Sequence, residues 1–278
     1  MKITKLFSFL FLAVIMASCS SSDGGSSTND EATVALNGTN VTLSGVVAQR
    51  SEDIFLISAD TPDGASIQLL FNKFGDMEEF SYWEDVDTYY NFQHFNSHYF
   101  TFNLISVNES SRRVKVSFSG DLYLNDEDLT SPTKTVSGTF DLPYITQTPA
   151  IAGLGLKCKI AGADWYDTEF WDNGFGGEVD RKFISDDENQ IIMTFSGTEI
   201  PPGVYNFTTA SANKIQLAKY NTTTNTYKVY NTSGSVTITS NTEGFIRIIE
   251  GTYSFTATNP SNPSDVIQIT NGSFKTNF

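Results

Sequence analysis

Short stretches in which polar and apolar residues alternate recur along much of the chain, and they restrict the possible folds more than any other feature. Alternation with a period of two is typical of strands that bury one face. The composition agrees, because 32 Thr outnumber 15 Ala and because the chain contains 22 Phe and 12 Tyr. We therefore predict an all-β protein with strands at residues 114–118, 135–142, 227–230, 236–238, 245–249, 251–257 and 266–269.

The N-terminus has the layout of an export signal. Lys2 and Lys5 precede an apolar run at residues 6–16, which is too short to span a bilayer. The run ends in Ala17-Ser18-Cys19, which resembles the lipobox of bacterial lipoproteins. That resemblance implies removal of residues 1–18, attachment of lipid to Cys19, and a location at the outer membrane. An ordinary cleaved signal peptide is the alternative, and the sequence leaves open whether the protein faces the surface or the periplasm.

Residues 19–31 are predicted to form a flexible tether, because they are rich in Ser and Gly and contain no large apolar residue. The remaining chain is divided near residues 147–149 into two β domains, 32–147 and 148–278. Glycines recur in similar contexts in both parts, at Ser119-Gly120 and Ser137-Gly138 in the first and at Ser233-Gly234 and Glu250-Gly251 in the second. We expect two tandem antiparallel β-sandwich or open-barrel domains, with an aromatic insertion at residues 74–102 in the first.

Charge and cysteine content exclude several classes of function. A formal net charge of −15 argues against a surface that binds nucleic acid. Once Cys19 carries lipid, Cys158 is the only remaining thiol, and its alternating context predicts a buried position. No disulfide is then expected within the mature chain, and no cysteine-based metal or redox site.

The second half resembles a group of uncharacterised Bacteroidota lipoproteins. The resemblance covers roughly residues 155–275 and rests on residues 157–165, on Pro202-Gly203-Val204-Tyr205, on residues 233–238 and on residues 250–255. It implies small β-sandwich or open-barrel domains at the cell envelope, and it implies no catalytic residue. The first half lacks the opening Trp and the Pro-Gly-Val-Tyr segment.

The insertion at residues 74–102 is dense in aromatic residues. Spacing of Phe80, Trp83 and Val86 predicts a short helix within residues 77–90 that lies on the sheet. Its aromatics are expected either to form core or to offer a platform for a sugar ring, with Tyr82 and Trp83 as candidate ligand-binding residues. The two histidines of the chain, His94 and His98, are expected at the surface, because no third zinc ligand follows from the pattern.

A second aromatic and acidic segment spans residues 164–177 and is predicted to be an exposed recognition loop. Its candidate ligand-binding residues are Asp164, Tyr166, Trp165, Trp171 and Asp172. Oxygens of Asp164, Asp167 and Asp172 offer a possible calcium site, although the spacing matches no EF-hand loop. No other cofactor is expected.

No catalytic motif occurs in the chain, so we expect that it is not an enzyme. A strongly raised carboxylate pKa beside a second carboxylate in a cleft would favour a hydrolase instead. The expected function is that of a lipid-anchored envelope protein that binds an extracellular ligand such as a glycan. The alternative is a structural or assembly lipoprotein that binds another envelope protein, through an exposed edge strand.

Overall fold

The computed structural model describes residues 30–172, 178–197, 200–242 and 247–277, with only the backbone for residues 170–172 and 178–179. Almost all of its regular structure is β-strand, as the sequence predicts. The predicted signal, the attachment site at Cys19 and the tether up to residue 29 lie outside the described residues, as do residues 245–246 of the strand predicted at 245–249. Among the helices that the structure describes, none is both long enough and apolar enough to cross a membrane.

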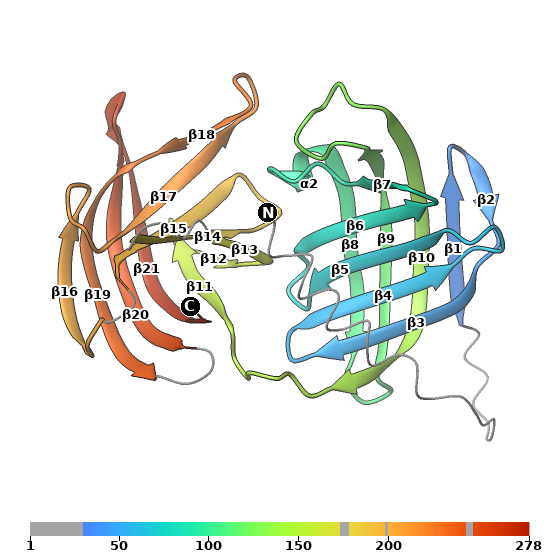
Figure 1. Cartoon of the computed structure of the whole chain (residues 1–278), viewed down its shortest axis with the longest axis horizontal. Helices are drawn as coiled ribbons and strands as arrows, with labels where there is room; N and C mark the ends of the chain where they lie inside the picture. Colours follow the sequence, from blue (N-terminus) through green and yellow to red (C-terminus); the bar gives the residue numbers. More distant parts are fainter. Residues whose placement is uncertain (1–29, 173–177, 198–199, 243–246, 278) are drawn as a thin grey trace.

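The first ten strands form one sheet in the order β2-β1-β10-β3-β4-β5-β6-β7-β9-β8 (Figure 1). The sheet closes on itself, because β10 pairs with β9 as well as with β1 and β3. One short helix, α2 (Asn96–Tyr99), precedes β8. The strands are β1 (Glu31–Leu36), β2 (Thr39–Val41), β3 (Ser44–Ser51), β4 (Ile54–Asp60), β5 (Ser66–Asn72), β6 (Met77–Glu84), β7 (Asp87–Tyr90), β8 (Phe100–Asn108), β9 (Arg113–Tyr123) and β10 (Thr133–Gln147).

The remaining strands form two further sheets, in the orders β12-β11-β21-β20-β19-β16 and β13-β14-β15-β17-β18. Every strand pair in these two sheets is antiparallel. The strands are β11 (Gly155–Ile160), β12 (Ala163–Tyr166), β13 (Glu169–Asp172), β14 (Glu178–Ile184), β15 (Asn189–Ser196), β16 (Gly203–Thr208), β17 (Lys214–Asn221), β18 (Thr226–Val229), β19 (Asn231–Thr242), β20 (Ile248–Asn259) and β21 (Asn262–Asn277).

Alternation along the strands builds two large cores. Side chains such as Phe55, Leu69 and Phe140 fill the interior of the closed first sheet. Phe183, Ile215 and others fill the space between the two C-terminal sheets. A third, smaller cluster joins the two halves, because it contains Phe92 and Tyr123 from the first and Tyr220 from the second. The aromatic insertion therefore contributes core and also the contact between the halves.

The glycines that recur in both halves have a common structural role. Each lies directly opposite an aromatic residue on the neighbouring strand, in the pairs Gly120–Phe100, Gly138–Phe118, Gly234–Phe255 and Gly251–Phe274. A side chain on any of these glycines would overlap its aromatic partner. The halves nevertheless differ in which strand carries the aromatic partner. Gly120 lies opposite Phe100 on the preceding strand, β8, and opposite Val136 on the following strand, β10. The partner of Gly234, Phe255, lies on the following strand, β20.

The prediction of a short helix within residues 77–90 is wrong. These residues form the β6–β7 hairpin, with Asp85 in the left-handed region at φ 50° and Val86 95% exposed at the turn. Phe80 points into the core of the first sheet, and β6 pairs with β5 along its other edge. A three-residue spacing of apolar side chains was misleading here, because Val86 belongs to a turn and packs against nothing.

Candidate functional site

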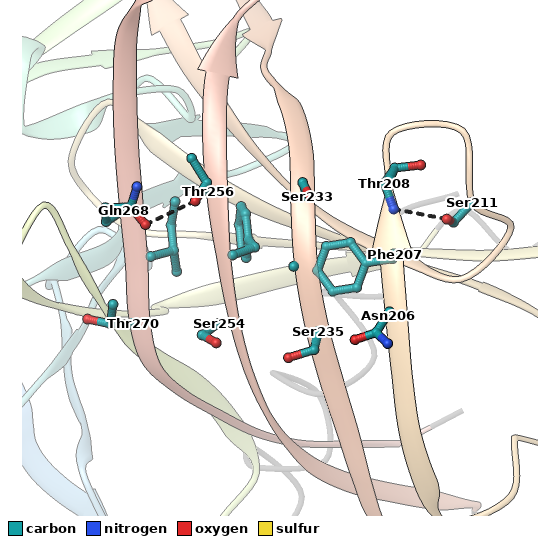
Figure 2. A pocket seen from close by; sticks show the side chains of 13 residues that line it. Asn206, Phe207, Thr208, Ser211, Ser233, Ser235, Ser254, Thr256, Gln268 and Thr270 are labelled. Carbon is teal, nitrogen blue, oxygen red and sulfur yellow. Dashed lines mark hydrogen bonds between the residues drawn. The ribbon is translucent and has the colours of Figure 1, made fainter.

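The clearest candidate site is a groove on the outer face of the larger C-terminal sheet, which we call the hydroxyl groove. It has a volume of about 610 Å³ and runs across β16, β19, β20 and β21. Figure 2 shows the side chains that line it side by side on these strands. The ones that carry the argument are Asn206, Ser233, Ser235, Ser254, Thr256 and Gln268.

Strand alternation places these side chains outside. Phe207, Val236 and Phe255 occupy the intervening positions and point into the core, where they are almost completely buried. Successive side chains of a strand point to opposite faces, so the polar residues between them must face the solvent. Asn206, Ser233, Ser254, Gln268 and Thr270 are indeed exposed, and Ser235 and Thr256 are half-buried.

Cross-strand pairing arranges the polar side chains in two rows. Ser233 lies opposite Thr208 on one side and Thr256 on the other, and Thr256 lies opposite Gln268. In the second row, Ser235 lies opposite both Asn206 and Ser254. Neighbouring strands lie about 4.8 Å apart, so each row presents hydrogen-bonding groups at a regular spacing.

Most of these hydroxyls are available to a ligand. The Thr256 hydroxyl donates a hydrogen bond to Gln268 Oε1 at 3.0 Å, and the Ser211 hydroxyl accepts one from the Thr208 amide at 2.9 Å. Within the described part of the chain, no hydrogen bond engages the side chains of Ser233, Ser235 or Ser254. Each hydroxyl offers one donor and two acceptor positions, and the groove therefore suits a ligand that is itself rich in hydroxyls.

The groove carries no charge. None of its lining residues is Asp, Glu, Lys, Arg or His, although the chain as a whole has a formal net charge of −15. Complementary charges favour the binding of ionic ligands, and the side chains that line the groove provide none. An uncharged ligand fits this chemistry best.

A smaller groove of about 390 Å³ lies between the two halves of the chain. Its lining includes Phe95 and Lys228, and Phe95 adopts a left-handed backbone conformation with φ 46°. Lys219 forms an ion pair with Glu188 at the same groove. Lys228 is a second basic residue of this lining, against the single acid Glu188, so the smaller groove has a formal excess of one positive charge.

The segment predicted as an exposed loop at 164–177 is different in the structure. Residues 163–166 form β12 and residues 169–172 form β13. Trp165 is only 4% exposed, and its indole Nε1 donates a hydrogen bond to Asp187 Oδ1 at 3.1 Å. The prediction that Trp165 is exposed is therefore wrong, since its ring belongs to the C-terminal core.

The other predicted residues of this segment do not converge on one site. Tyr166 stacks on Phe74 of the first half, with ring centroids 3.6 Å apart. Asp164 is exposed and forms an ion pair with Lys159 at 2.6 Å. The side chains of Trp171 and Asp172, which we also predicted to bind ligand, lie outside the described residues.

The candidate residues of the aromatic insertion face different ways. Tyr82 is 4% exposed within the first core, with the Lys134 ammonium 5.3 Å from its ring centroid. Trp83 is half-buried on the opposite face of β6. Tyr82 therefore serves as core, and the structure does not bring it together with Trp165 or with the hydroxyl groove.

The residues considered for metal binding are also dispersed. His94 packs against Tyr220 and Tyr227, whereas His98 is exposed and stacks on Phe95. Asp167 accepts a hydrogen bond from the Leu156 amide at 2.7 Å. Across residues that the structure describes, no group of three or more His, Cys, Asp or Glu side chains is arranged to hold a metal ion.

Cys158 lies in the C-terminal core, as predicted, where burial raises its thiol pKa to about 12. Several carboxylates also have raised pKa values, and they lie where the two halves meet. Neither of the two grooves described above includes these carboxylates in its lining. The hydroxyl groove itself was missed by sequence reasoning, although Ser and Thr occupy alternate positions of residues 233–239 and 252–258.

Comparison with known proteins gives one result. Residues 184–276 are similar to a family described as "Domain of unknown function (DUF6252)". The match covers less than half of the chain and includes β16, β19, β20 and β21, the strands of the hydroxyl groove. A search of curated proteins and a search of solved structures both returned no match.

Proposed function

We propose that this protein is a lipid-anchored protein of the cell envelope that binds an uncharged glycan in the hydroxyl groove. The observation that carries the proposal is the array of uncharged hydroxyl and amide side chains on four neighbouring strands of a strongly acidic chain. A neutral sugar presents several hydroxyl groups at once, and each can exchange a hydrogen bond with water for one with a Ser, Thr, Asn or Gln side chain.

The location is supported by the N-terminal sequence. The lipobox-like Ala17-Ser18-Cys19 and the tether at residues 19–31 suit a folded body held at a membrane by lipid. Such an anchor places the groove at the outer membrane, where extracellular or periplasmic glycans are available. Substitution Cys19→Ser should release the protein from the membrane fraction, and retention of the variant in that fraction would contradict the anchor.

The groove is tested by removal of its free hydroxyls. The triple variant Ser233→Ala, Ser235→Ala and Ser254→Ala keeps the strand faces and removes three hydrogen-bonding groups. At about 1 kcal/mol for each lost hydrogen bond, affinity for the glycan should fall about 100-fold. Binding is measured by calorimetry against a panel of neutral oligosaccharides, because Trp165 is buried and its fluorescence would not report on the groove.

A matched control removes three exposed hydroxyls from the first half, by Thr101→Ala, Ser110→Ala and Ser111→Ala. This control should bind as tightly as the unmodified protein. The proposal fails if no neutral glycan binds saturably, or if the groove variant and the control variant bind equally well. A preference for anionic over neutral oligosaccharides would also contradict it.

One observation favours a second candidate, in which a partner protein adds a strand to the sheet. β16 is the last strand of the six-stranded sheet, and Val204 on this strand is 68% exposed. Edge strands with apolar exposed positions are common sites of strand addition. A photo-crosslinker at position 204 that recovers one envelope protein, and a Val204→Lys variant that loses it, would support this candidate.

A further inference from the structure

The residues that line the hydroxyl groove follow the register of the sheet. The groove takes three consecutive residues from each of β16, β19, β20 and β21. The middle residues of these triplets face one another from strand to strand, since Gly234 is paired with both Phe207 and Phe255, and Phe255 is paired with Ile269. The groove therefore runs across the four strands and not along any one of them (Figure 2).

The middle residues form the floor of the groove. Phe207, Phe255 and Ile269 turn their side chains into the C-terminal core, and Gly234 has no side chain. The flanking residues point outward instead and form the two polar rows, which are two positions apart on each strand, or about 7 Å. The rows are thus the two walls of a trough whose floor is main chain.

Both ends of this trough can be located. β16 is the last strand of its sheet, and the loop that follows it contributes Ser211 to the lining. Beyond β21 the next strand is β11, where Lys159 lies opposite Thr270 and forms an ion pair with Asp164. The uncharged lining therefore covers four strands, which span three gaps, or about 14 Å.

Given the proposed function, on which this inference rests, we infer that the groove binds an extended, neutral, β-1,4-linked glycan chain that lies across the strands with one sugar over each of them. In a β-1,4-linked chain of glucose or mannose, the bonds that join the rings are equatorial. The rings therefore form a flat ribbon with hydroxyl groups along both edges. The ribbon lies on the floor of the trough, and each edge exchanges hydrogen bonds with one polar row.

The spacing of the strands favours this linkage over one that coils. An extended β-1,4-linked chain advances per sugar by a distance close to the strand spacing of about 4.8 Å, so each ring meets the side chains of one strand. An α-1,4-linked chain coils and leaves the plane of the sheet within a few rings. A stiff chain that is already extended also loses little conformational freedom when it binds.

Calorimetry with chains of defined length and linkage tests this inference. The probes are β-1,4-linked gluco- and manno-oligosaccharides of two, four and six sugars, and α-1,4-linked malto-oligosaccharides of the same lengths. In at least one β-1,4-linked series, affinity should rise by about tenfold or more from two to four sugars and by less than about threefold from four to six, because the trough covers four strands. The α-1,4-linked tetrasaccharide should bind about tenfold more weakly than the β-1,4-linked one, or weaker still.

These measurements separate failure of the inference from failure of the proposed function. If other neutral glycans bind in the groove but neither β-1,4-linked tetrasaccharide binds more tightly than the α-1,4-linked one, the inference is overturned and the proposed function stands. If no neutral glycan binds, the proposed function fails and the inference fails with it.

Variants at the two ends of the trough test the direction of the chain. Asn206→Ala on β16 and Gln268→Ala on β21 should each weaken binding of the β-1,4-linked tetrasaccharide about fivefold, because a chain across the strands contacts both side chains. The disaccharide needs only two neighbouring strands, so its affinity should change less than about twofold in either variant. Thr252→Ala removes an exposed hydroxyl from β20 outside the groove and should bind as the unmodified protein does. Loss of tetrasaccharide affinity in only one of the end variants would place the ligand along the strands and overturn the inference.

Discussion

Gly234 lies beneath the hydroxyl groove, and its replacement by Ala should destabilise the C-terminal half by about 2 kcal/mol. A Cβ at this position would lie 2.6 Å from Phe255 Cα, and closer still to Phe255 Cβ and to the Ser254 carbonyl oxygen. All three atoms belong to the neighbouring strand or to the base of its side chain, so no rotation can relieve the overlap. Overpacking of this kind costs about 1–3 kcal/mol, and the lower flexibility of Ala in the unfolded chain offsets less than about 1 kcal/mol of it.

Thermal unfolding followed by circular dichroism measures this effect. At about 4 °C per kcal/mol for a unit of this size, the melting temperature should fall by about 8 °C. Ser235→Ala, at the next position of the same strand but with its side chain outside, provides the matched control and should shift the midpoint by less than about 2 °C. Equal midpoints for Gly234→Ala and Ser235→Ala would refute the argument that the glycine is required by close approach of the strands.

Three further predictions concern buried polar groups. Trp165→Phe removes the indole donor from Asp187 and should lower the free energy of unfolding by about 1–3 kcal/mol in urea titrations; a change below about 0.5 kcal/mol would count against this bond. Cys158, whose pKa burial raises to about 12, should react with iodoacetamide far more slowly in the folded protein than in denaturant, and equal rates by mass spectrometry would contradict its burial. The pKa values of Asp167 and Asp186 rise from 3.8 to about 7 on folding, so their contribution to stability is fully present below about pH 4 and is lost as the pH rises through about 7; a melting temperature that does not fall between about pH 5 and about pH 8 would be inconsistent with these shifts.

Strand positions could be predicted because alternation is a local property. The predicted strands at 114–118, 135–142 and 251–257 all lie within observed strands, and Cys158 is buried on the face that its neighbours indicated. Local pattern failed at residues 77–90, where apolar residues at a helical spacing belong to a hairpin. Pairing with β5 decided the outcome there, since backbone hydrogen bonds to a neighbouring strand outweigh a weak helical periodicity.

The candidate site was harder to predict than the fold. Sequence reasoning favoured aromatic residues as ligand contacts, but Trp165 and Tyr82 are required by the cores. Aromatic side chains are large and apolar, so in a small β domain they are the first to be buried. The Ser and Thr residues of the groove looked like ordinary solvent-facing positions, because only the order of the strands in the sheet places them side by side.

The sequence by itself determined the β architecture, the acidic character of the chain, the burial of Cys158 and the residues that face outward on each strand. These properties depend on side-chain chemistry and on a two-residue period, both of which are local. Tertiary structure alone decided that β16, β19, β20 and β21 are neighbours and that the Met77 amide of the first half meets the Asp186 carboxylate of the second. Strand order and the docking of the two halves depend on contacts between residues far apart in the chain, and no local pattern encodes which of many compatible partners will be chosen.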